Sequence, residues 1–207
     1  MKKIWATFFY FLSLVILGFF ISNLSKIDSP LGNFRAELWF ICFVILTCSF
    51  HTPRQIIKSL INFNVLKQPA TYFYIVLSLL LPYVLLMLCV NYEILLDKRL
   101  IYFYKHGLFQ QQDTLAIIHA TILNPIWEEL FFRGVLLFSL LKLMKPIWAI
   151  SLTSILFALF HPSYWIVTLL SGILLSLLTY KTKSIIPAIL SHALWNFYIA
   201  YLFFYFS

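Results

Sequence analysis

The sequence predicts an all-α, polytopic helical membrane protein with about seven transmembrane helices, in a range of roughly six to eight. Hydrophobic residues make up 62% of the 207 residues, charged residues only 11%, and the mean hydropathy is +0.93. Soluble domains are about half apolar and a quarter charged. Because a membrane helix needs about 20 apolar residues, we expect residues 1–207 to form a single integral membrane domain without a separate soluble domain.

The first three helices are predicted from apolar runs. Residues 4–21 follow two lysines, as in a signal peptide, but no small-residue cleavage site comes after them. We therefore expect a retained first helix or signal anchor. The second helix covers residues 37–50. The third covers residues 71–90 and contains Pro82, where we expect a kink.

The fourth helix covers residues 114–141 and follows the longest polar loop, residues 91–113. It is interrupted by Asn124 and Pro125. Proline removes a backbone donor and disfavours helix in the residue before it. Pro125 therefore either kinks this helix or begins a new one that Asn124 caps. The last three predicted helices cover residues 147–160, 164–180 and 184–206.

The positions of the lysines and arginines predict the topology. With a cytoplasmic N-terminus, nine of them fall in cytoplasmic segments: Lys2, Lys3, Arg54, Lys58, Lys67, Lys142, Lys145, Lys181 and Lys183. Five fall outside: Lys26, Arg35, Lys98, Arg99 and Lys105. This bias follows the positive-inside rule. We expect an integral membrane protein of a bacterial plasma membrane, with its N-terminus in the cytoplasm and its C-terminus outside.

Neither the cysteines nor the net charge of +8 suggests a further function. Cys42, Cys48 and Cys89 lie in apolar runs without a CxxC pair, so no disulfide framework or cysteine metal site is expected. The basic residues are scattered between apolar segments and form no block. We expect no nucleic-acid partner.

The stretch "NPIWEELFFRG" places Glu128, Glu129 and Arg133 inside an apolar helix. A charge at the centre of a membrane helix costs about 2.5–3.5 kcal/mol, so three independent charges would cost roughly 8–10 kcal/mol. Glu129 and Arg133 are four residues apart and can pair, which offsets part of that cost. Glu128 lies about 100° round the helix from Glu129 and needs another partner.

Two later helices offer such partners. "FALFHP" places Phe157 and His161 four residues apart, and "SHALWN" does the same for His192 and Asn196. Any one of these polar groups alone could hold helices together. Together, one acid, two histidines and an amide form a set suited to hydrolysis.

Water is the expected nucleophile of such a site. Ser191 precedes His192, but adjacent helical side chains diverge, so Ser191 is a poor candidate. A carboxylate in a medium of low dielectric constant has its pKa shifted toward neutrality, which suits a general base. Histidine can relay that proton, and two donors one helical turn apart can face an oxyanion. Of the other histidines, His51 and His106 are expected in solvated loops, and His119 is kept as an outer neighbour of the site.

Three motifs in order resemble those of a known family. EExxxR (Glu128, Glu129, Arg133), FxxxH (Phe157, His161) and HxxxN (His192, Asn196) are similar to motifs of the CPBP family, which comprises CAAX-prenyl-protein endopeptidases and bacteriocin-processing or immunity proteins, also called Abi proteins. The resemblance covers residues 113–198, with the catalytic core expected within residues 113–207. It implies an intramembrane glutamic-type endopeptidase.

The resemblance also implies roles. Glu128 would activate water with His161 as its partner, His192 and Asn196 would form the oxyanion site, and Glu129 and Arg133 would support the first motif. The substrate would be a membrane-associated peptide or lipidated protein, in CAAX-type processing or in bacteriocin maturation or immunity. We expect no cofactor. Two histidines and a glutamate could also hold zinc, but HExxH is absent.

Two other classes of function stay open on the sequence. A non-catalytic immunity or assembly factor of the same fold would act by binding. A proton-coupled transporter would line a path with glutamate and histidine. The absence of repeated halves or paired broken helices argues against the transporter.

Overall fold

The computed structural model describes residues 2–24, 34–106 and 114–199, with the side chains of residues 2–4 and 24 left out. Those residues are helical apart from short connections and contain no strand, which confirms the predicted all-α class. The chain falls into two compact units, Met1–Ser59 and Leu60–Ser207.

The first unit contains α1 (Lys2–Leu24), α2 (Arg35–Ser49) and nearly all of α3 (His51–Leu60). α1 and α2 pack against each other. A hydrogen bond of 3.0 Å between the hydroxyls of Tyr10 and Thr47 joins them. Such a bond between two apolar helices satisfies both polar groups where no water is available.

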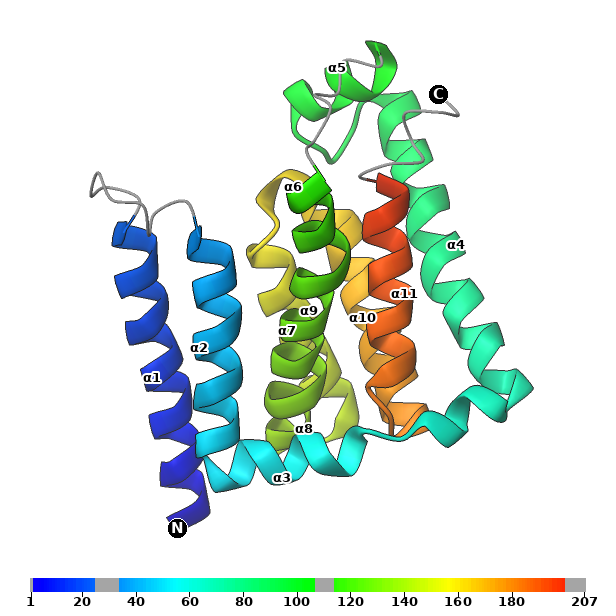
Figure 1. Ribbon diagram of the computed structural model, residues 1–207. Coiled ribbons are helices and arrows are strands. Elements are labelled where there is room, and N and C mark those ends of the chain that lie inside the picture. Colours follow the sequence, from blue (N-terminus) through cyan, green and yellow to red (C-terminus); the bar gives the residue numbers. More distant parts are fainter. Residues whose placement is uncertain (1, 25–33, 107–113, 200–207) are drawn as a thin grey trace. The chain divides into compact units, whose positions relative to one another are not determined.

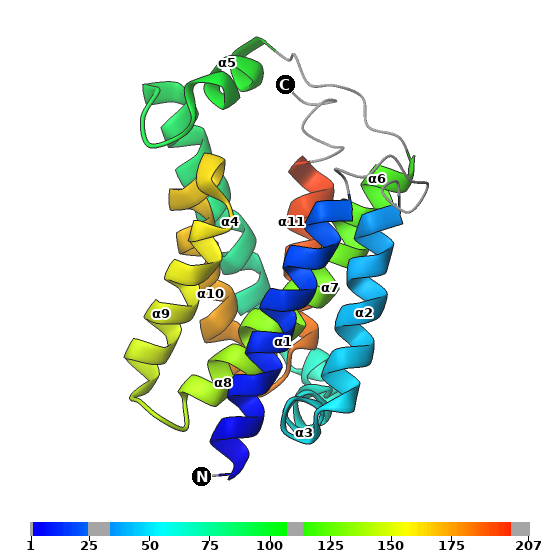
Figure 2. The same cartoon turned by 90° about the vertical axis from the view of Figure 1, so that its left-hand side faces the viewer.

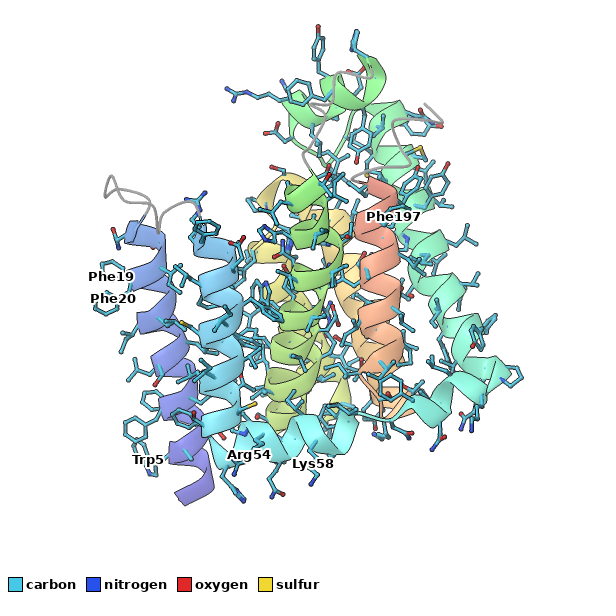
Figure 3. All side chains as sticks on the ribbon, viewed as in Figure 1. Trp5, Phe19, Phe20, Arg54, Lys58 and Phe197 are labelled. Atoms are coloured by element: carbon cyan, nitrogen blue, oxygen red, sulfur yellow. The ribbon has the colours of Figure 1, made fainter. Side chains whose placement is uncertain are left out.

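Aromatic side chains cover the outside of α1. Trp5, Phe19 and Phe20 are each more than half exposed and project away from the helix (Figure 3). A soluble protein rarely leaves so many large apolar groups in water. Their exposure agrees with a helix that faces lipid.

α3 is amphipathic, in contrast to the apolar helices. The chain bends by 100° between Arg35–Ser49 and the following helical stretch, His51–Lys67. Ile56 is buried, whereas the basic side chains of Arg54 and Lys58 lie on the other side of α3 (Figure 3). This pattern is typical of a helix that lies at a membrane surface.

The second unit is built around α10 (Trp165–Thr182). It contacts α4 (Pro69–Tyr92), α9 (Pro146–Leu159) and α11 (Ile186–Phe197). α11 also packs against α4 and α7 (Asn124–Glu129), and these helices run alongside one another in both views (Figures 1 and 2). Their facing sides enclose the polar residues that the sequence singles out.

α9 and α10 approach each other closely because small residues face each other. A Cβ atom added to Gly172 would lie 3.0 Å from the Cβ and 3.1 Å from the Cα of Ser154. Small residues let membrane helices pack at short range. The close packing holds the end of α9, which His161 follows by two residues, in a defined position.

The fourth predicted helix is continuous over residues 114–140, so Asn124 does not cap a new helix. It comprises α6 (Thr114–Ile118), the π-helical η3 (His119–Leu123), α7, the π-helical η4 (Leu130–Leu136) and α8 (Leu137–Leu140). Asn124 has helical dihedral angles, and its N–H donates to the carbonyl of His119, five residues back. π-Helical turns often occur at functional sites.

The predicted polar loop 91–113 contains a helix that the sequence analysis did not anticipate. α5 (Lys98–His106) begins after Asp97, whose side chain accepts hydrogen bonds from the N–H groups of residues 99 and 100. Asp at this position favours a helix start. Ile101 and Tyr104 are buried, and residues 107–113 lie outside the described part of the chain.

The seven predicted segments all contain a helix, although fewer of these helices have the length of a full span. Four in the described residues do: Trp5–Asn23, Pro69–Tyr92, Thr114–Leu140 and Pro162–Thr182. A fifth arises if the bent pair Arg35–Ser49 and His51–Lys67 counts as one. α9 is apolar but shorter. The last prediction, residues 184–206, extends past the described residues after position 199.

Candidate active site

The second unit contains a cavity of about 200 Å³ among α4, α7, α9, α10 and α11. Three of its walls carry the predicted motif residues. It is lined by Ser78, Ala120, Asn124, Glu128, Phe157, His161, Tyr164, Val167, Thr168, Ser171, Leu175, Ser191, His192, Trp195, Asn196 and Ile199. The tertiary fold therefore brings Glu128, His161, His192 and Asn196 to one cavity, as the sequence predicted.

Glu128 faces both histidines. Its Oε2 atom lies 3.8 Å from Nε2 of His161 and 3.9 Å from Nε2 of His192. These distances exceed a direct hydrogen bond. Both imidazoles thus have the same relation to the carboxylate, whereas the sequence analysis had paired Glu128 with His161 alone.

The end of α9 orients His161. Its Nδ1 donates to the carbonyl of Phe157 at 2.9 Å, because a carbonyl can only accept. The Phe157 carbonyl also accepts the N–H of Phe160, and Pro162 prevents the helix from continuing. The hydrogen bond between the two ends of the FxxxH motif therefore caps α9. It also leaves Nε2 of His161 available to the cavity.

Glu129 orients His192. Its Oε1 accepts a hydrogen bond from Nη1 of Arg133 and another from Nδ1 of His192, each at 2.8 Å. The predicted pairing of Glu129 with Arg133 is present, and the contact with His192 is an addition that spacing along the sequence does not reveal. This second hydrogen bond directs Nε2 of His192 toward Glu128.

Arg133 is fully buried, and an aromatic ring contributes to its surroundings. Its guanidinium carbon lies 4.1 Å from the centre of the Phe157 ring. A cation above an aromatic face is stabilised by the ring's quadrupole, more strongly where water is excluded. Phe157 therefore links the first motif to the helix that carries His161.

Asn196 reaches the cavity wall from α11. Its Nδ2 atom donates to the carbonyl oxygen of Ala120 at 2.8 Å. A side-chain amide has two N–H groups, so the second stays available to the cavity that Asn196 lines. His192 and Asn196 share one face of α11, as their spacing predicted.

Several lining residues were not identified from the sequence. Ser78 comes from α4, and its hydroxyl donates to the carbonyl of Ile75 at 2.8 Å. The hydroxyl of Ser191 lies 2.7 Å from that of Ser78 and is hydrogen-bonded to it. This bond agrees with the expectation that Ser191 is a poor nucleophile. Tyr164 and Thr168 also line the cavity, and their closeness to His161 along the chain was the only sign of this in the sequence. His119 is in η3 and is not among the residues that line the cavity.

The donor atoms of this cluster are of the kinds that bind zinc, but they lie farther apart than zinc ligands do. Two imidazole nitrogens and one carboxylate oxygen are zinc ligands, and tetrahedral ligands at about 2.1 Å are about 3.4 Å apart. The separations of 3.8 and 3.9 Å from Glu128 are wider. In the described part of the chain, no group of three or more His, Cys, Asp or Glu residues is placed to hold a metal ion.

Comparison with known proteins identifies the segment that carries this site. Residues 110–198 match the family of type II CAAX prenyl endopeptidases, Rce1-like. This Rce1-like match is consistent with the CPBP/CAAX protease family and confirms the resemblance seen in the motifs. The Rce1-like family is a protease family, so the match supports an intramembrane protease of the CAAX type at the family level. No curated protein and no solved structure matches the chain.

Proposed function

We propose that this protein is an intramembrane endopeptidase in which Glu128 activates water to hydrolyse a peptide bond of a membrane-associated substrate. The observation that carries the proposal is the convergence of one carboxylate oxygen and two imidazole Nε2 atoms within 4 Å in a cavity. A water molecule placed among them has an acceptor for its proton and a partner that can return that proton.

The reaction proceeds in two steps. Glu128 takes a proton from water as the water oxygen bonds to the peptide carbonyl carbon. The tetrahedral oxyanion accepts hydrogen bonds from the imidazolium of His192 and from the second N–H of Asn196. The C–N bond then breaks, and the leaving amine takes a proton from the Glu128–His161 pair.

Glu129 and Arg133 serve this chemistry indirectly. The carboxylate of Glu129 accepts from Nδ1 of His192 and stabilises its imidazolium form. Arg133 offsets the second negative charge of the cluster. We propose that the site needs no metal, because the carboxylate and the two imidazoles already supply the base, the acid and one oxyanion donor.

The setting of the cavity supports a lipidated substrate. A second, apolar hollow of about 340 Å³ lies between α4 and α11. Trp195 belongs to the walls of both hollows. We propose that the peptide enters the polar cavity while its covalently attached lipid lies in the apolar hollow, as suits a prenylated CAAX peptide. The bacteriocin leader stays the alternative substrate.

Hydrolysis of a farnesylated fluorogenic peptide ending in C-a-a-X by the purified protein tests this function. Glu128→Gln keeps the side chain's shape and removes the base, so turnover should fall by roughly 10²–10⁴-fold with an unchanged melting temperature. Glu93→Gln makes the same substitution at an exposed carboxylate and should keep full turnover. Full turnover in Glu128→Gln would refute the assignment.

A second peptide panel addresses the alternatives. Cleavage of a bacteriocin leader peptide without cleavage of the farnesylated peptide would replace the substrate class and retain the chemistry. If Glu128→Gln preserves the protein's biological effect in cells, the protein acts by binding, as an immunity or assembly factor.

A further inference from the structure

Pro125 leaves a carbonyl oxygen of its own helix without a helical donor. In the π-helical register here, the N–H of residue 124 donates to the carbonyl of His119. The next bond in that register would run from residue 125 to the carbonyl of Ala120. Proline has no N–H, so this bond cannot form.

Asn196 supplies the missing donor from another helix. Its Nδ2 lies 2.8 Å from the Ala120 oxygen. A partly buried carbonyl that lacks a donor is unfavourable, so this contact favours close packing of α11 against η3. Those two elements do pack against each other. The hydrogen bond also determines the orientation of the amide, because one N–H is committed to Ala120 and the other then points elsewhere.

We infer that Pro125 is a positioning residue for the reaction: by withholding an N–H from the Ala120 carbonyl, it reserves that carbonyl to hold the Asn196 amide as an oxyanion donor. The inference rests on the proposed function of Asn196. It also explains why a proline stands three residues before Glu128 in a helix that continues through it.

The test is a double-mutant cycle of Pro125→Ala and Asn196→Ala, with turnover of the farnesylated C-a-a-X peptide and melting temperature as readouts. Asn196→Ala should lower kcat by roughly 10²–10³-fold with little change in KM. Pro125→Ala provides an N–H that competes for the Ala120 carbonyl. It should lower kcat by roughly 10–10²-fold without lowering the melting temperature, since it removes a proline from a helix.

The double mutant distinguishes positioning from a purely structural role. Its kcat should equal that of Asn196→Ala within about threefold, because Pro125 acts only through Asn196. Its melting temperature should recover most of what Asn196→Ala loses, because residue 125 now satisfies the Ala120 carbonyl. Pro82→Ala serves as the matched control, since Pro82 is also a buried helical proline, in α4; it should combine additively with Asn196→Ala.

Additive losses of kcat from Pro125→Ala and Asn196→Ala would overturn the inference, since Pro125 would then act through the placement of Glu128. Additive changes of melting temperature would overturn it as well. Failure of the proposed function has a different signature. If Asn196→Ala keeps wild-type turnover, Asn196 is no oxyanion donor, and the coupling in melting temperature then reports the contact alone.

Discussion

Replacing Glu129 by glutamine removes a negative charge from a buried network and nearly preserves the side chain's shape. Glu129 Oε1 accepts from Arg133 and His192 at 2.8 Å each, and the Glu129 and Arg133 side chains have no exposed surface. Removing one partner of a buried ion pair costs about 3–5 kcal/mol. At about 2–4 °C per kcal/mol for a chain of this length, the melting temperature should fall by roughly 6–20 °C.

Turnover should fall in the same variant for a separate reason. The amide oxygen can still accept from Nδ1 of His192, but it no longer stabilises the imidazolium by charge. The loss expected from a neutralised carboxylate behind a catalytic histidine is on the order of 10²–10⁴-fold in kcat. Thermal unfolding in detergent and hydrolysis of the farnesylated peptide measure the two effects on one preparation.

A second variant separates stability from chemistry. Combining Glu129→Gln with Arg133→Met removes both buried charges, so the unpaired cation disappears and most of the melting temperature should return. Turnover should stay low, because the charge behind His192 is still missing. The reasoning is refuted if Glu129→Gln melts within about 2 °C of the wild type, or if the double variant regains turnover.

Three further outcomes are expected. Gly172→Val should destabilise the α9–α10 pair by about 1–3 kcal/mol, because the new Cβ meets the backbone of Ser154; an unchanged melting temperature would contradict this close packing. Turnover should survive chelation and dialysis, whereas one zinc per chain, with activity lost on its removal and regained on its return, would establish a metalloprotease. Pairing with Lys105 lowers the pKa of the Glu93 carboxylate, so this ion pair should stabilise the last turn of α5 at neutral pH and lose its effect as the pH falls through that lowered pKa. Hydrogen exchange of α5, compared with Lys105→Gln at matched pH, measures the difference, and equal protection at neutral pH would show that the pair contributes nothing.

The sequence alone determined the class of the fold and singled out four polar residues that the structure brings to one cavity. Apolar runs predict membrane helices because the bilayer leaves no other way to satisfy the backbone, and all seven runs contain a helix. Glu128, His161, His192 and Asn196 stand out because charged and polar groups are costly inside such helices. The helical spacing also predicted the pairing of Glu129 with Arg133 correctly.

The sequence analysis did not predict the amphipathic helix α5, because it searched for long apolar runs. Its apolar residues, 100–104, form a run far shorter than a membrane span, and basic residues flank that run on both sides, so the segment resembles a polar loop. The continuity of the fourth helix through Pro125 was also undecided, because π-helical geometry and a donor from α11 together compensate for the missing N–H.

Only the tertiary structure decided which polar groups meet. Spacing along one helix cannot show that His192 donates to Glu129, 63 positions earlier, or that Asn196 donates to Ala120. Nor can it show that both histidines present the same nitrogen to Glu128. Contacts between helices depend on how closely their backbones approach. Small residues such as Gly172 and Ser154 allow that close approach. Which helices pack together in this way cannot be deduced from the order of residues along the chain.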